Sequence, residues 1–435
     1  MNKINELKEK ILIPIQRYYV ALLLFALATI EMIMVIQRDY HHLSTRDNMK
    51  IVLTLIYGAI VALVIRNIIE RFSQKIKSPN LLYLLIPILM VFVYLVVLND
   101  MGLESQILKY CILCLLSGLL FFIIPFIDRK EDSDYYSYKV IMSLIFTGLC
   151  YVILTLGLIF TILSIAILFE ITINEHVYVQ IAIFILGFIM PAIFLTDIPE
   201  SALKRKEYPE LIMKLVMYLI FPILSLYTVV LYAYFLKILL TLKWPTNVLG
   251  NLVIYYSLIS IFVLYFTNNL EKENTWHNKF ISIYPYTLIL PMLMMLISFI
   301  IRINQYGFTE ARYYALVCFL FVMITIFIIK TKNKVKYIPL TLSILLLIST
   351  FGPLSAFNIS RISQTKRLEN ILIKNNMLKD NTIIKNSNLN EITKDEIYQL
   401  LIYINERHGF DDIYFLPKGF ELDDMEEVFG FSYIL

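Results

Sequence analysis

The sequence predicts an all-α fold, a polytopic transmembrane helical bundle of about 11 spans followed by a small, mainly helical soluble module. Of its 435 residues, 59% are hydrophobic and 17% are charged, whereas an ordinary soluble domain carries roughly 25% charged residues. The apolar residues gather in eleven long stretches, and Lys and Arg concentrate on every second connecting segment. Lipid is therefore the expected solvent for most of the chain.

Each apolar stretch is near the length of about 20 residues that a helix needs to cross roughly 30 Å of hydrocarbon. The stretch from Val140 to Phe169 contains no charge over thirty residues, so we expect this helix to tilt or to extend beyond the membrane. Prolines within spans predict kinks; they are Pro87, Pro191, Pro222 and Pro291. The predicted spans are 15–36, 49–68, 80–98, 107–127, 140–168, 177–196, 215–236, 247–266, 284–301, 313–329 and 337–353.

The basic residues predict an orientation. The N-terminal segment and every second loop carry 21 Lys and Arg, and the alternate loops carry 8. Because cytoplasmic loops are enriched in Lys and Arg, the N-terminus is expected in the cytoplasm. An odd number of spans then places everything after Gly352-Pro353 outside.

The C-terminal module, residues 355–435, differs in composition from the bundle, residues 1–354. It holds nine Lys or Arg and thirteen Asp or Glu, so it is predicted to be a separate soluble, acidic and extracytoplasmic domain. A partial helical stripe over 359–372 is expected to continue from the last span, and the polar 375–390 stretch is expected to be a loop. Thr393 begins a capping-box pattern that predicts a helix over 394–407, and 423–428 suggests a short further helix.

Three motifs occur in order over about 215–376. They are Leu-Lys-Trp244-Pro245, the segment Arg302-Ile-Asn-Gln-Tyr-Gly-Phe-Thr-Glu-Ala-Arg-Tyr313, and Gly352-Pro-Leu-Ser-Ala-Phe357. Together they resemble the bacterial membrane family known as domain of unknown function 4153, and the remaining spans resemble it more loosely. The resemblance implies a multi-pass protein of the bacterial cytoplasmic (inner) membrane and supplies no catalytic residues. Thr246-Asn247 departs from the Gly that the family pattern has soon after the Pro, which leaves the local turn open.

The same motifs supply the best candidate for a ligand site, because the predicted topology places them all on the outer face. Two cations and one anion at a membrane edge suit a phosphate- or carboxylate-bearing lipid headgroup. The alternative is that both Arg side chains extend to the interface, that Glu310 neutralises one of them, and that Tyr and Trp form the interfacial belt. The candidate ligand-binding residues are Arg302, Gln305, Tyr306, Glu310, Arg312, Tyr313 and Trp244.

Glu31 is predicted to lie about 7 Å inside the outer end of the first span, where an uncompensated carboxylate is costly. It needs a partner, a raised pKa or a water-lined cavity, or it extends to the interface. Cys111-x-x-Cys114 lacks an accompanying His or second Cys pair, and the adjacent His41 and His42 lack a third ligand. We therefore predict no metal and no cofactor.

Three classes of function follow from these features. The chain is a transport or lipid-handling protein, an envelope-facing sensor or scaffold acting through its C-terminal module, or, as the alternative, a membrane enzyme resembling glycosyltransferases that act on lipid-linked substrates. The expected partners are the lipid bilayer and either anionic headgroups or an envelope protein contacting the C-terminal module. Basic cytoplasmic loops are topology signals, so no nucleic-acid partner is expected, and no catalytic residue is predicted.

Overall fold

A computed structural model describes residues 12, 14–40, 45–99, 103–127, 133–196, 198, 214–241, 248–267, 275–331 and 337–432. Within these ranges, ten helices are long and apolar enough to cross a membrane. They confirm the predicted all-α, polytopic class. Each one overlaps a predicted span, because a helix that satisfies its own backbone is one of the few structures that lipid tolerates.

The eleventh predicted span, 337–353, is the short helix α15 (Ile338–Thr350). Its 13 residues extend about 20 Å at 1.5 Å per residue, less than the hydrocarbon thickness. The outer location of the C-terminus depends on this helix and stays a prediction.

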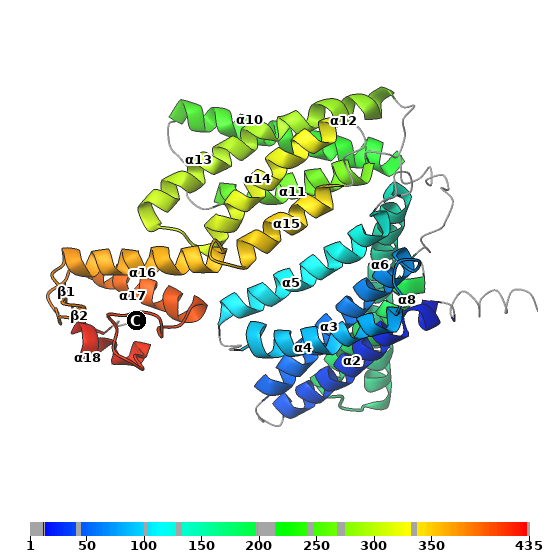
Figure 1. Cartoon of the computed structure of the whole chain (residues 1–435), viewed down its shortest axis with the longest axis horizontal. Helices are drawn as coiled ribbons and strands as arrows, with labels where there is room; N and C mark the ends of the chain where they lie inside the picture. Colours follow the sequence, from blue (N-terminus) through cyan, green and yellow to red (C-terminus); the bar gives the residue numbers. More distant parts are fainter. Residues whose placement is uncertain are drawn as a thin grey trace, which may run out of the picture. The chain divides into compact units, whose positions relative to one another are not determined.

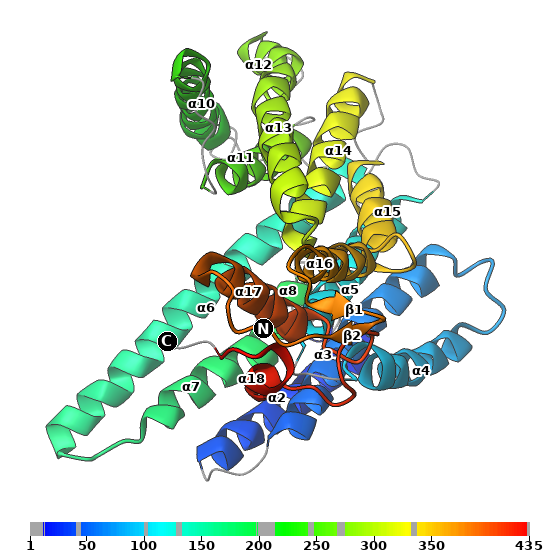
Figure 2. The same ribbon diagram turned by 90° about the vertical axis from the view of Figure 1, so that its left-hand side faces the viewer.

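Backbone contacts divide the chain into two compact units. The first unit comprises Met1–Met101 and Tyr110–Glu207. In this unit α2 packs along α3, and α4 packs against α3 (Figure 1). Helix α7 packs against α2 (Figure 2). Its main helices are α2 (Tyr19–Tyr40), α3 (Arg46–Arg71), α4 (Leu85–Phe92), the greater part of α5 (Glu104–Ile123), α6 (Ser133–Phe169), α7 (Glu175–Phe184) and α8 (Met190–Thr196).

Two of the four prolines predicted within spans follow wide π turns. The π turn Ile185–Ile189 ends two residues before Pro191, and the π turn Val216–Ile220 ends two residues before Pro222. A proline ring clashes with the carbonyl one turn earlier, and a π turn widens the helix at that point. The kinks predicted at Pro191 and Pro222 are thus accommodated without ending the helix, whereas the helix is interrupted at Leu288, three residues before Pro291.

The second unit comprises Gly102–Lys109 and Tyr208–Leu435. Here α13 packs against α11 and α14, and α14 packs against α15 (Figure 2). Their shared core contains Phe221, Met292 and Phe321. The apolar helices of this unit are α10 (Phe221–Thr241), α11 (Val248–Thr267), α12 (Thr275–Thr287), α13 (Ile289–Tyr306), α14 (Glu310–Lys330) and the short α15.

The C-terminal module belongs to the second unit and has a hydrophobic core of its own. Leu368 and Leu372 of one helix meet Ile397, Leu401 and other apolar residues of the next. Its elements are α16 (Ala356–Lys374), β1 (Leu378–Lys379), β2 (Thr382–Ile383), α17 (Glu391–Arg407) and α18 (Met425–Phe429).

Three local predictions for this module are corrected. Helix α16 does not run on from the last span, because Gly352 adopts a φ of 92° and Ser355 caps a new helix. The predicted loop 375–390 contains the antiparallel pair of β1 and β2. The cap of α17 is Asn390, whose side chain accepts a hydrogen bond from the Thr393 amide, so this helix begins three residues before the predicted one.

Candidate functional site

A tight turn, Tyr306–Thr309, joins α13 to α14 and receives side chains from α16; we call it the Gly307 turn. The Gln364 amide nitrogen donates to the carbonyls of Tyr306, at 3.1 Å, and Phe308, at 2.6 Å. The Phe308 amide donates to Ser363 Oγ at 2.9 Å. These bonds satisfy backbone groups that the ends of two helices leave without helical partners. The C-terminal module is thereby attached to the membrane helices.

Gly307 is required by this arrangement. Its φ is 71°, a region that favours glycine. An added Cβ would also lie 2.8 Å from Ser363 Oγ and 3.1 Å from the Gln364 amide nitrogen. Any side chain here would therefore push α16 away from the turn.

Glu310, the first residue of α14, is buried with 3% of its surface exposed. The Tyr403 hydroxyl of α17 donates to Glu310 Oε2. Ser360 Oγ of α16 lies 2.8 Å from the same hydroxyl. A carboxylate of the membrane helices is thus connected by hydrogen bonds to both long helices of the C-terminal module.

His408 provides the opposite charge when it is protonated. Its Nε2 lies 3.1 Å from Glu310 Oε1, and both side chains are 4% exposed. The relative orientation of the two groups is not that of a hydrogen bond, so the attraction between them is electrostatic. Such a pair depends on both partners, because removing one leaves an uncompensated buried charge.

Tyr403 is a stable donor in this cluster. Burial, together with the negative charge of Glu310, raises the pKa of the Tyr403 hydroxyl well above its ordinary value. Both effects disfavour the phenolate. The hydroxyl therefore keeps its proton throughout the physiological pH range.

Two arginine side chains lie over the ring of Tyr306, the first residue of the Gly307 turn. The guanidinium carbons of Arg312 and Arg367 lie 5.7 and 5.4 Å from the ring centroid. Arg312 Nη1 donates to the Gly307 carbonyl at 2.6 Å, and Arg367 Nη2 pairs with Glu396 at 2.5 Å. Arg302 and Arg367 are close enough to Arg312 for their charges to repel it. We call Arg302, Arg312 and Arg367 the arginine cluster.

The structure brings most of the predicted ligand residues to one end of α13 and α14. Arg302 and Tyr306 end α13, Gln305 is exposed, and the Tyr313 hydroxyl donates to the Leu354 carbonyl at 2.7 Å. Glu310 and Arg312 diverge, the first toward the C-terminal module's His408 and the second toward Tyr306. Trp244 lies outside the described residues.

The other candidates have simpler surroundings. In the first unit, the Asn48 side-chain amide donates to Glu31 Oε1 at 2.6 Å, so the intramembrane carboxylate has a neutral partner. Cys111 and Cys114 are free thiols on α5. His41 and His42 lie outside the described residues. Among the residues that the structure describes, no group of three potential ligands can hold a metal ion.

Several residues of the site were not anticipated from the sequence. They all belong to the C-terminal module, and the Glu310 to Tyr403 bond spans 93 positions. No local pattern encodes such a pairing. The only available signal was Gly307, which marks a special backbone position. The residues concerned are Ser360, Ser363, Gln364, Arg367, Tyr403 and His408.

Comparison with known proteins supports the family suggested by the motifs. A model of the family described as "Domain of unknown function (DUF4153)" matches residues 16–384, which include every membrane helix, the Gly307 turn and α16. The chain belongs to this family.

One relative is the "Uncharacterized protein PM1469" of Pasteurella multocida (strain Pm70). It is 26% identical over 202 residues, which cover 45% of this chain and 34% of the relative. The matched part of the chain thus spans about a third of the length of that relative. No solved structure matches the chain.

Proposed function

We propose that this DUF4153 protein is a membrane-embedded scaffold or sensor whose C-terminal module docks a basic segment of an envelope protein. The observation that carries the proposal is a groove on this acidic module, lined by core side chains such as Phe415 and Phe420 and by four charged residues, Lys385, Lys418, Asp424 and Glu427. The connection through the Gly307 turn and Glu310 holds this surface to the membrane helices. Transmission from an occupied groove to the helices through this connection is part of the proposal.

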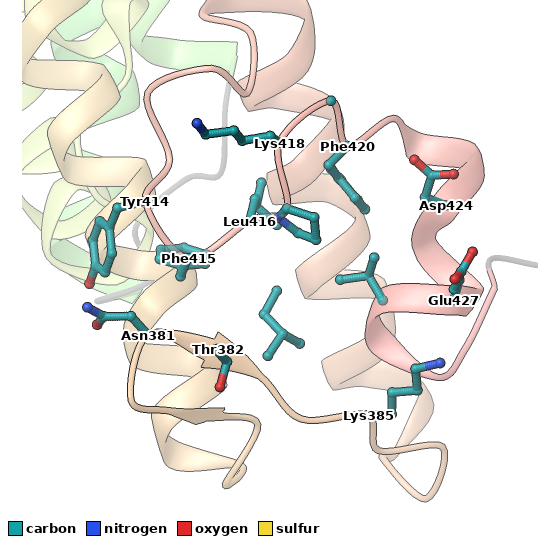
Figure 3. Close-up of a pocket in the computed structure, with 14 residues that line it drawn as sticks. Asn381, Thr382, Lys385, Tyr414, Phe415, Leu416, Lys418, Phe420, Asp424 and Glu427 are labelled. Atoms are coloured by element: carbon teal, nitrogen blue, oxygen red, sulfur yellow. The ribbon is translucent and has the colours of Figure 1, made fainter.

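The groove has a volume of about 610 Å³. Figure 3 shows apolar side chains such as Leu416 and Phe420 within it, with Asp424 and Glu427 together along one side and Lys385 and Lys418 elsewhere on the lining. This combination suits a short segment that inserts an apolar side chain and presents cations to the two carboxylates. The lining residues are Asn381, Thr382, Ile383, Lys385, Tyr414, Phe415, Leu416, Pro417, Lys418, Gly419, Phe420, Asp424, Glu427 and Val428.

Charge selects the kind of partner. Between Asp411 and Glu427 the chain carries seven acidic residues and a single basic one, Lys418. Electrostatic complementarity favours a basic partner and accelerates its association. It also disfavours direct approach of this surface to an anionic membrane.

Orientation decides where such a partner resides. The 21 to 8 distribution of Lys and Arg supports an N-terminus in the cytoplasm, and α15 as an eleventh crossing would place the C-terminal module outside the bacterial cytoplasmic membrane. Reporter fusions at 204–206 and after Asn390 are expected to report opposite sides. Fusions that report the same side would require a cytoplasmic partner.

The docking proposal is tested with the full chain in nanodiscs of neutral lipid. A labelled peptide of alternating Lys and Leu should bind, and a peptide of alternating Glu and Leu should not. Replacing Asp424→Lys together with Glu427→Lys should weaken binding about tenfold or more, because two attractive charges become repulsive.

The matched control makes the same change of charge on α17, away from the groove, with Asp395→Lys and Glu406→Lys. This variant should bind the basic peptide as the unmodified protein does. Equal binding of the two peptides, or equal losses in the two double variants, would contradict the proposal. In cells, a photo-crosslinker at Tyr414 should then trap a partner whose crosslinked segment is basic.

Lipid handling is the second candidate, and the arginine cluster favours it. A transport pathway through the first span receives less support, because Glu31 is hydrogen-bonded to Asn48. A carboxylate with that partner has a structural role in holding α2 to α3.

A further inference from the structure

The arginine cluster is assembled from two parts of the chain. Arg302 and Arg312 come from the membrane helices α13 and α14, and Arg367 comes from α16 of the C-terminal module. Arg312 and Arg367 both lie over Tyr306 and both donate to its carbonyl, each at 3.3 Å. The cluster is therefore complete only when the module is attached at the Gly307 turn.

Arg312 pairs with no carboxylate among the residues that the structure describes. Glu396 pairs with Arg367, while Glu310 is engaged by Tyr403 and His408. Neither of these carboxylates pairs with Arg312, whose hydrogen-bond partners are the carbonyls of Tyr306 and Gly307. In the part of the chain that the structure describes, Nε and Nη2 of Arg312 have no protein partner. Like charges brought together at a surface raise its affinity for an anion.

The position of the cluster indicates the form of that anion. Tyr306 ends an apolar span, Asn278–Tyr306, and is 48% exposed. On the same helix Ile297 and Ile300 are 41% and 47% exposed, which is expected of side chains that face acyl chains. An anion here lies at the boundary between the hydrocarbon and the headgroups, where arginine can bind phosphate through two parallel hydrogen bonds.

We propose that the arginine cluster binds the phosphate of an anionic phospholipid headgroup. Arg312 offers Nε and Nη2 as a fork, and Arg302 and Arg367 neutralise the remaining charge. Because Arg367 belongs to the module, bound lipid also strengthens the attachment of the C-terminal module to the membrane helices. This inference rests on the geometry of the cluster and is independent of a peptide partner in the groove of the C-terminal module.

The test uses the purified full chain in detergent and measures lipid binding by native mass spectrometry and by thermal stability. Dioleoyl phosphatidylglycerol should bind about tenfold more tightly than dioleoyl phosphatidylcholine, and sodium chloride should weaken its binding. Inorganic phosphate separates the two sources of the anion. If phosphate stabilises the protein as well as phosphatidylglycerol does, the site is one for free phosphate and the lipid assignment is overturned.

Substitutions test the geometry. Arg312→Lys keeps a positive charge and one donor, so the protein should fold, yet phosphatidylglycerol binding should fall nearly as much as in Arg312→Ala, because an ammonium cannot form the two parallel bonds. Arg367→Ala should weaken binding by a similar factor. Arg361→Ala is the matched control, because this arginine of α16 pairs with Asp412 on the module. Binding of wild-type strength in Arg312→Lys, or equal losses in Arg361→Ala and Arg367→Ala, would overturn the proposal.

Discussion

The buried pair of Glu310 and His408 makes a quantitative prediction about attachment of the C-terminal module. The change is His408→Leu, which keeps most of the side-chain volume and removes the countercharge of a carboxylate that is 4% exposed. When His408 is protonated, removing one partner of this buried ion pair costs about 3–5 kcal/mol. Tyr403 continues to donate to Glu310, so the lower end, about 3 kcal/mol, is expected.

The double variant Glu310→Met with His408→Leu should be the more stable protein. It removes both charged groups, and replacing a buried pair with apolar residues of similar volume is often neutral or stabilising. The Tyr403 hydroxyl keeps Ser360 as a partner. Adding Glu310→Met to His408→Leu should therefore restore about 2 kcal/mol of the free energy of unfolding. A coupling of this size is expected for contacting residues.

Hydrogen exchange of the α17 amides in the full chain measures this effect. A loss of about 3 kcal/mol corresponds to exchange faster by roughly a hundredfold, at 1.4 kcal/mol per factor of ten. Glu391→Met is the control, since that carboxylate is 89% exposed and should leave protection unchanged. The reasoning is refuted if His408→Leu exchanges at the wild-type rate, or if the double variant is less protected than the single one.

The membrane part of the fold could be predicted from the sequence because its driving force is local. Burial in lipid requires an apolar helix of a minimum length, so each of the ten long helices overlaps a predicted span. Boundaries were less accurate where polar residues extend a helix past the hydrocarbon. Helix α6, predicted over 140–168, begins at Ser133.

The C-terminal module was predicted in part. The apolar spacing of Ile397, Leu400, Leu401 and Ile404 indicated α17, and all four are buried. Its start was misplaced because Asn390 and Thr393 both head a pattern that is typical of helix caps. The choice between them depends on which side chain receives the amide hydrogen bond, and that is a property of the folded backbone.

The candidate site was also predicted only in part, because its residues are local in sequence and their partners are distant. Arg302, Tyr306, Glu310 and Arg312 were identified because they are polar residues concentrated at the end of an apolar span. Their partners could not be, because the ion pair with His408 joins segments nearly a hundred residues apart. The expectation that Glu310 neutralises an arginine was reasonable from proximity in sequence, whereas the fold brings it to His408 and Tyr403.

Three further predictions concern single residues. Gly307→Ala should lower the free energy of unfolding of the full chain by about 1–3 kcal/mol, which is the cost of a non-glycine residue held at positive φ. The added Cβ would also clash with Ser363 Oγ. An unchanged melting temperature would mean that the turn relaxes without loss. Glu70→Ala in the first unit should destabilise the protein more than Glu70→Gln. Glu70 accepts two hydrogen bonds from Arg17, at 2.8 and 2.6 Å, and the glutamine side chain retains one acceptor oxygen. Thermal melts that rank the variants in the opposite order would contradict this role. Alkaline pH should detach the C-terminal module. The pKa of Tyr403 is raised in the folded state, so the stability that its hydroxyl provides is fully present below the ordinary tyrosine pKa of about 10 and is lost as the pH rises above it. Exchange of the α17 amides, corrected for its intrinsic pH dependence, should therefore accelerate above about pH 10 in the wild-type chain. Tyr403→Phe lacks the titrating proton and should lose this acceleration, and an identical alkaline profile in both proteins would place the titrating group elsewhere.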